Sequence, residues 1–203
     1  MRIMGDLCKW VVVGMVMMVW GACNWNVSFN AEETALLRAI PPSGIMRVYK
    51  ITSPSDSLFL RQQAKPFTME ALDTEEYGLL KAGMLATVQD TTDAGVGIAA
   101  PQIGISRCLI AVQRFDKPAE PFEFYINPEI VYYSEEKAEG WEGCLSIPDV
   151  RAGVERSKEI VVSYIDEITT TEKRDTVRGF TAVIFQHETD HLKGILFTDR
   201  VKL

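Results

Sequence analysis

The chain's only two histidines stand four residues apart near its carboxyl end, in the pentapeptide His-Glu-Thr-Asp-His at residues 187–191. Side chains at this spacing project from one face of an α-helix, so both imidazoles can bind one metal ion while Glu188 lies beside it. The apolar stretch at residues 179–186 predicts that this helix is buried, and Gly194 supplies a stop signal. The chain must then fold around a helix that carries polar groups inward. The alternative interpretation is a pair of polar side chains on a solvated helix face.

A third metal ligand has to come from elsewhere in the chain, because a catalytic metal ion usually takes three protein ligands and keeps one position for water. The twelve residues after His191 contain no histidine or glutamate, which places the missing ligand upstream. Of the four cysteines, Cys144 is the clearest candidate. It lies in Trp-Glu-Gly-Cys-Leu-Ser-Ile-Pro at residues 141–148, where a glycine allows close backbone approach and a proline ends the segment. Cys108 lies in an apolar, strand-like run, which favours a small buried hydrophobic residue.

This set of residues predicts a metal-dependent hydrolase. A Cys144 thiolate with two neutral imidazoles, from His187 and His191, leaves a divalent ion with a net charge of roughly +1, enough to acidify a bound water. Glu188 is the carboxylate of the motif that does not bind the metal, so it can accept the water proton and pass it to a leaving amine. Glu188 is therefore the expected general base.

Three segments resemble signature motifs of the peptide deformylases. They read Gly-Val-Gly-Ile-Ala-Ala-Pro-Gln-Ile-Gly at residues 95–104, Glu-Gly-Cys-Leu-Ser at 142–146 and Gln-His-Glu-Thr-Asp-His at 186–191, and they follow one another in the family's order. The resemblance runs from about Met46 to Leu203 and leaves out the first forty-odd residues. It implies removal of the N-formyl group from N-formylmethionyl peptides with release of formate. It also implies an α+β fold with β-sheets around a central helix that carries the H-E-x-x-H motif.

The resemblance implies roles for further residues. Gln102 and the Leu145 backbone N–H would donate hydrogen bonds to the oxyanion formed at the formyl carbon. Gly97 and Arg151 would contact the extended peptide substrate. Without the resemblance, the residues favour a surface amide after a proline turn for Gln102. Arg151 is then equally typical of an ordinary surface arginine, and Gly95 and Gly97 are typical of a loop.

Two other functions remain open from the residues: a metallohydrolase of the same scaffold that acts on another amide, and a metal-binding protein without catalysis. Glu188 and Gln102 speak against the second, because metal binding alone needs neither a base nor an oxyanion donor. The family implies Fe²⁺, whereas Zn²⁺ would survive better outside a reducing cytosol. We therefore keep Fe²⁺ and Zn²⁺ as candidates of equal standing.

Composition is that of a soluble globular domain, with 47% hydrophobic and 24% charged residues. The net charge of −7 argues against nucleic-acid binding. Coarse patterning predicts a helix opened by a capping box at Asn30 and closed before Pro41, and a second helix from Asp73 to near Asp90. It predicts strands at residues 108–112, 122–126, 130–133, 160–165 and 176–178. Because only three residues follow Arg200, we expect no C-terminal helix of the kind that many bacterial family members carry.

The amino-terminal segment is typical of an export signal. Arg2 and Lys9 precede an uncharged apolar stretch at residues 10–22, which is shorter than the roughly 20 residues that span a bilayer as a helix. Small residues precede Cys23 as in a bacterial lipobox, although Trp20 replaces the usual aliphatic residue. We predict a signal peptide at residues 1–22, lipidation of Cys23, a linker or tether at 23–45 and a catalytic domain at 46–203. The protein would be an exported bacterial lipoprotein that associates with the membrane through its lipid; the alternative is a cytoplasmic protein.

Overall fold

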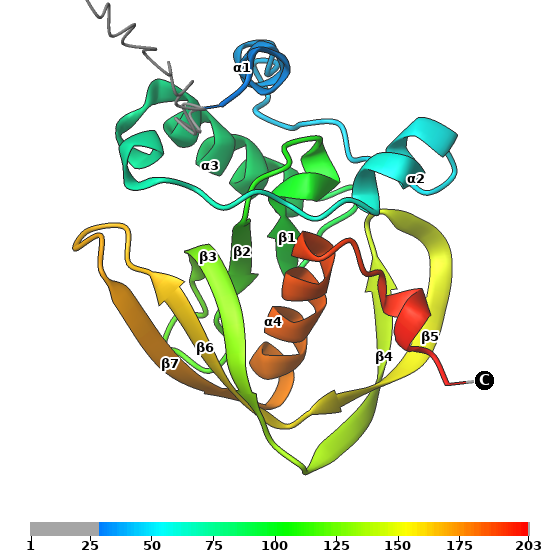
Figure 1. Ribbon diagram of the computed structural model, residues 1–203. Helices are drawn as coiled ribbons and strands as arrows, with labels where there is room; N and C mark the ends of the chain where they lie inside the picture. The colour runs from blue at the N-terminus through cyan, green and yellow to red at the C-terminus, as the bar shows by residue number, and fades with distance from the viewer. Residues whose placement is uncertain (1–28, 203) are drawn as a thin grey trace, which may run out of the picture.

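Helix α4 (Gly179–Leu192) lies between a five-stranded sheet and a two-stranded hairpin (Figure 1). The computed structural model describes residues 29–202. The remaining helices are α1 (Ala31–Arg38), α2 (Pro54–Leu60) and α3 (Glu75–Val88), with the 3-10 turns η1 (Met69–Asp73), η2 (Ala100–Ile103) and η3 (Phe197–Arg200). The strands are β1 (Gly97–Ala99), β2 (Leu109–Gln113), β3 (Phe122–Tyr133), β4 (Lys137–Cys144), β5 (Ile147–Ser157), β6 (Glu159–Ile165) and β7 (Glu172–Arg178). This arrangement confirms the expected α+β fold with sheets around the motif helix.

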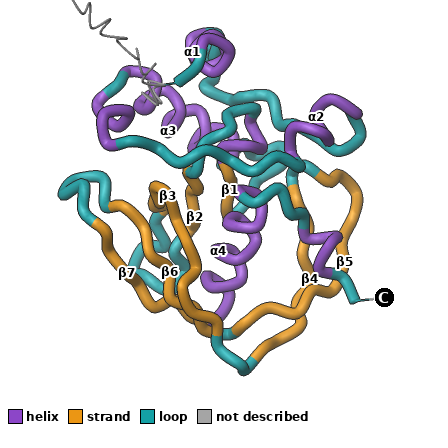
Figure 2. Tube along the Cα trace, viewed as in Figure 1, coloured by secondary structure: helices purple, strands orange, loops and turns teal. Residues whose placement is uncertain are grey.

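The larger sheet has the strand order β1-β2-β3-β6-β7, and every neighbouring pair is antiparallel. The first four residues of strand β2, Leu109 to Val112, are apolar, and both faces of the strand are covered. Leu109 and Ala111 pack into the cluster formed with α3, while Ile110 and Val112 pack into the cluster formed with α4. Figure 2 shows α1, α2 and α3 gathered at one end of the molecule, with most strand residues at the other.

The ends of the two longer helices follow local signals in the sequence. Helix α3 is capped by the Thr74 side chain, which accepts a hydrogen bond from the Tyr77 backbone N–H, so the cap is one residue later than predicted at Asp73. Beyond α4, Gly194 adopts φ +69°, and a Cβ there would collide with the Arg61 carbonyl. Glycine is thus required at position 194 for two reasons: its positive φ, and the lack of room for a Cβ. This agrees with its predicted role as the stop signal of the helix.

The β4–β5 hairpin was not predicted, because its residues do not alternate between apolar and polar. Strand β4 is exposed along most of its length and contains Gly140 and Gly143. The two strands predicted at 122–126 and 130–133 are one strand, β3, interrupted where Asn127 adopts φ +49° and the register with β6 shifts. The Asn127 side chain stabilises this bulge by hydrogen bonding to both backbone groups of Phe67.

Helix α1 is part of the folded body. Its predicted capping box is present, with Asn30 and Glu33 exchanging side chain to backbone hydrogen bonds of 2.9 Å. The helix packs against α3, Leu37 is fully buried, and Glu33 forms a buried ion pair of 2.7 Å with Arg107. Within the predicted linker or tether at residues 23–45, residues 29–45 thus pack on the domain through apolar residues and a paired carboxylate. The division into domains stays a prediction.

The predicted signal peptide and the predicted lipidation residue Cys23 lie outside the described residues. Within residues 29–202 there is no helix of the length and apolar character needed to cross a membrane.

Candidate metal centre and active site

Three predicted metal ligands converge at one point. Cys144 ends strand β4, and His187 and His191 occupy successive turns of α4. Their ligand atoms all lie within 4.8 Å of one another, and Cys144 Sγ is 3.2 Å from His191 Nε2. The two imidazole rings lie 5.0 Å apart. One thiolate and two imidazoles in this arrangement provide the donor set of a three-ligand divalent metal site.

A buried ionic network orients the first histidine. His187 Nδ1 is 2.8 Å from Glu142 Oε2, and Arg156 donates two hydrogen bonds to the same carboxylate at 2.8 and 3.0 Å. Arg156 also donates to Asp190 at 2.6 Å, and Arg200 makes a further bidentate contact with Asp190. A carboxylate on Nδ1 fixes the ring so that its Nε2 faces the metal position.

The electrostatics of this cluster favour a positive charge among the predicted ligands. Burial alone would raise the pKa of Glu142, but hydrogen bonds from His187 and Arg156 hold it at about 2. Burial opposes charge on His187, yet contacts with Cys144 and Glu142 keep its pKa well above the usual value. Burial and the neighbouring positive charges hold the pKa of His191 well below the usual value. A cation between these groups would take the place of the proton and keep the same partners.

Glu188 lies at the wall of the cleft, directly against strand β1. A Cβ added to Gly97 would lie 2.6 Å from Glu188 Oε1 and 2.7 Å from the Ile184 side chain, so only glycine leaves room for this carboxylate. Burial raises the pKa of Glu188 to about 7, and its Oε2 has no hydrogen-bond partner among the described residues. A carboxylate with such a pKa and one free oxygen suits proton transfer near neutral pH.

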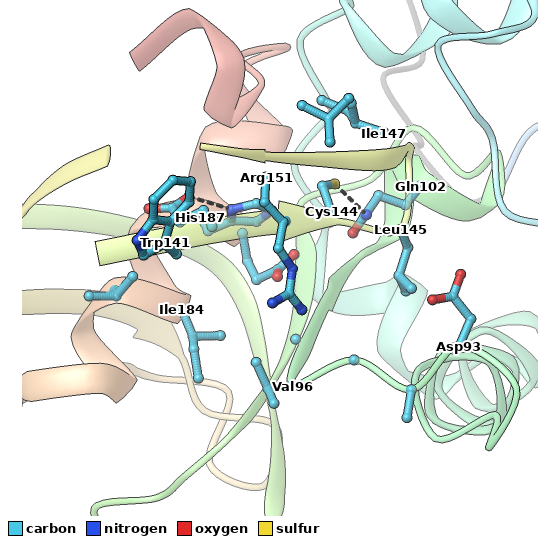
Figure 3. Close-up of a pocket in the computed structure, with 18 of the residues that line it drawn as sticks. Asp93, Val96, Gln102, Trp141, Cys144, Leu145, Ile147, Arg151, Ile184 and His187 are labelled. Carbon is cyan, nitrogen blue, oxygen red and sulfur yellow. Dashed lines mark hydrogen bonds and ion pairs between the residues drawn. The ribbon is translucent and has the colours of Figure 1, made fainter. Parts of the chain in front are cut away.

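Gln102 is held by its own backbone turn. The Ala99 backbone N–H donates to Gln102 Oε1 at 2.9 Å, which directs the amide nitrogen toward Cys144 Sγ at 3.5 Å and Ser146 Oγ at 3.3 Å (Figure 3). Gln102 is buried, so the alternative of a surface amide is wrong. Its N–H group lies beside the metal ligands, where a donor to a developing oxyanion is needed.

Two of the predicted ligands, Cys144 and His187, line one open cavity of about 600 Å³ together with the base Glu188 and the amide donor Gln102. Leu145, Gly97 and Arg151 also line it, so the structure brings the predicted site residues of the catalytic domain together, with His191 buried just behind the lining. Figure 3 shows the Arg151 side chain extending from the hairpin into this cleft, with its stem beside Gly143. Because Arg151 is exposed at the wall of the site, it is placed to meet a bound chain.

Comparison with known proteins agrees with this geometry. Residues 47–203 match the family model described as polypeptide deformylase. The chain belongs to the polypeptide deformylase family. The match includes all three ligand residues, and α1 (residues 31–38) lies outside the matched range.

Individual family members are similar over most of their length. The chain is 43% identical over 142 residues to the peptide deformylase of Pseudothermotoga lettingae, covering 70% of this chain and 77% of that one. It is 34% identical over 165 residues to that of Leptospira biflexa, covering 78% and 88%. A crystal structure of a class I type b peptide deformylase from Acinetobacter baumannii bound to Met-Ala-Ser has a TM-score of 0.68 and 36% identity, covering 77% and 98%.

Three parts of the site were not predicted from the sequence. Glu142 was recognised only as part of the motif at residues 142–146, without a role, and no role was predicted for Arg156 or Asp190. Together these three residues position His187. A glutamate two residues before a ligand cysteine was the available signal, since metal-binding histidines commonly have a carboxylate partner. Nothing local marked Arg156, which reaches the network from β5.

Proposed function

We propose that this chain hydrolyses the N-formyl group of N-formylmethionyl peptides and releases formate. The observation that supports it most is that the Glu188 carboxylate and the Gln102 amide line one open cleft with Cys144 and His187, two members of the clustered Cys-His-His ligand group. Binding of Met-Ala-Ser by the Acinetobacter relative, a peptide of the kind that deformylation leaves, supports the same substrate class.

Cys144, His187 and His191 would hold one Fe²⁺ or Zn²⁺ ion. The fit rests on the donor set and on the spacing of the ligand atoms. When bound, such an ion lowers the pKa of a water and polarises a carbonyl.

Glu188 would carry the protons of the reaction. Its free Oε2 accepts a proton from the attacking water, and the same carboxyl group then delivers it to the amine that leaves with the peptide. Gly97 permits this because it leaves the space that the carboxylate occupies.

The Gln102 amide and the Leu145 backbone N–H would stabilise the tetrahedral oxyanion. Gln102 is held in place by Ala99 before substrate arrives, so little reorganisation is needed at the moment of reaction. Arg151 and the backbone at Gly97 would line the path of the peptide that follows the formylmethionine.

The test compares two substrates that differ only in the acyl group. Metal-loaded protein should release formate from formyl-Met-Ala-Ser and leave acetyl-Met-Ala-Ser essentially intact. If the acetyl peptide is hydrolysed faster, or if neither peptide is hydrolysed, the result would instead favour a metallohydrolase of the same scaffold that acts on another amide.

We also propose that the mature chain begins at lipidated Cys23 and acts outside the cytoplasm on formyl peptides that have left the ribosome. The pattern of residues 1–23 supports this, and α1 would then connect the anchored end firmly to the catalytic domain.

Cys23→Ser should abolish labelling by a fatty-acid probe and release the protein from the membrane fraction. Cys8→Ser is the matched control, because residue 8 lies within the removed signal, and it should leave labelling unchanged. Recovery of full-length protein with Met1 retained in the cytosol would refute export.

A further inference from the structure

Contacts on both sides of Asn30 fix the amino-terminal end of the described chain to the folded body. The Phe29 ring packs edge to face against Phe67 at 5.6 Å, and Glu33 forms its buried ion pair with Arg107. If Cys23 carries a lipid, as proposed above, only five residues separate it from Phe29. Even fully extended, that connection spans about 20 Å. The end of the molecule that contains α1 must then lie close to the bilayer.

Exposed apolar side chains stand on the surface formed by α1, α2 and the chain between them. Leu58 on α2 is 72% exposed, Leu36 on α1 38%, and Ile51, just before α2, 36%. Figure 1 shows both helices at the end of the molecule where the described chain begins. Beside Leu36, a cavity of about 400 Å³ opens between the end of α1 and residues 45–49, and most of its lining is apolar. Large apolar side chains gathered in the open commonly mark a contact surface.

The segment that forms this surface is also the basic part of an acidic chain. Residues 29–65 contain five lysines and arginines and three aspartates and glutamates, a net charge of +2. Residues 66–203 contain 14 basic and 24 acidic residues, a net charge of −10. Two of the three acids in the basic segment, Glu33 and Asp56, are buried in ion pairs, and the acidic first turn of α3 is not part of the surface. An acidic protein can approach an anionic bilayer most easily with such a basic face toward it.

We propose that residues 31–61 form a surface that rests on a bilayer containing anionic phospholipids. The inference rests on the proposed lipidation of Cys23 and goes beyond it, because the folded surface itself binds lipid. Leu36 and Leu58 enter the boundary between headgroups and acyl chains, while the arginines and lysine of the same segment meet the phosphates. The lipid on Cys23 would then hold the protein at the membrane, and this surface would set its orientation there.

The test uses the chain of residues 23–203 made without a lipid, which contains every residue of the described fold. Its sedimentation is measured with vesicles of phosphatidylcholine alone and with vesicles of phosphatidylcholine mixed with phosphatidylglycerol. The mixed vesicles should bind it more strongly, by about fivefold for each basic residue that lies near the bilayer. Equal binding to both kinds of vesicle would contradict the role of the basic residues.

Leu58→Asp should lower the partition coefficient onto mixed vesicles by about tenfold or more, because it removes apolar area and adds a repelled charge. Ile168→Asp is the matched control, since Ile168 is 92% exposed in the turn between β6 and β7, outside the surface. It should bind as wild type does. Both variants should keep the wild-type Tm, because both positions are exposed. Wild-type binding by Leu58→Asp would overturn the proposal.

Hydrogen exchange locates the contact without any substitution. On mixed vesicles, backbone amides of residues 31–45 and 50–61 should exchange more slowly than in solution, whereas those of residues 166–171 should not change. Protection elsewhere in place of these segments would overturn the proposal, and so would a chain that stays in the supernatant with both kinds of vesicle. Because the tested chain carries no lipid, these results do not depend on Cys23. Absence of fatty-acid labelling refutes the lipidation proposal, and absence of vesicle binding refutes this one.

Discussion

Metal-loaded Glu188→Ala protein should hydrolyse formyl-Met-Ala-Ser about 10² to 10⁴ times more slowly than wild type, because it lacks the group that accepts and returns the proton. Glu188→Gln should be equally slow, since the amide keeps the shape of the side chain but cannot take a proton. Neither variant should lose metal, because Glu188 is not among the clustered ligand atoms. Formate release and metal content are the two measurements.

The fold should not suffer from this change. Glu188 is buried with one oxygen unpaired, so replacing it removes a desolvation cost, and we expect a Tm equal to or above that of wild type. Glu135→Ala, at an exposed position beside the hairpin, is the control and should leave the rate unchanged. A metal-loaded Glu188→Ala protein with the wild-type rate would exclude this carboxylate as the base.

Cys144→Ala should lose the metal ion. Loss of a partner that merely orients a ligand already costs about 10- to 100-fold in metal affinity, so loss of the thiolate itself should exceed the upper end of that range. The measurement is metal content after dialysis, with chelator competition for the affinity. Activity should fall with the metal.

Cys108→Ala is the matched control for this experiment. Cys108 is partly buried, donates to the Ala64 carbonyl at 3.4 Å, and its pKa is raised to about 11 by burial, all of which fit a structural residue. Its variant should bind one equivalent of metal. Stoichiometric binding at wild-type affinity by Cys144→Ala would show that the ligand set is wrong.

The parts of the structure that the sequence predicted are those with local causes. The shared face of His187 and His191 follows from helix geometry, and Gly194 is explained by the left-handed conformation that ends the helix. The capping box at Asn30 depends on a contact with Glu33, only three residues away. Strand β2 could be recognised because it is buried on both faces.

The parts that escaped prediction depend on contacts between distant segments. Cys144 Sγ meets His191 across 47 residues, and that meeting was inferred from motifs and not from any periodicity. Arg156 joins Glu142 and Asp190 across the hairpin and α4, so its role is visible only once both are in place. Helix α1 was assigned to a linker or tether because it lies between the export signal and the segment that resembles the family, and its buried Leu37 and paired Glu33 became visible only in the fold.

The most direct test measures hydrolysis of formyl-Met-Ala-Ser after the metal is removed from the protein and again after it is restored. Protein stripped by a chelator should release no formate from formyl-Met-Ala-Ser. Addition of one equivalent of Fe²⁺ under anaerobic conditions, or of Zn²⁺, should restore release of formate and of the free amino terminus of Met-Ala-Ser in equal amounts. If protein with its metal content verified at one equivalent yields neither product, the assignment of this cleft as a deformylase active site is wrong.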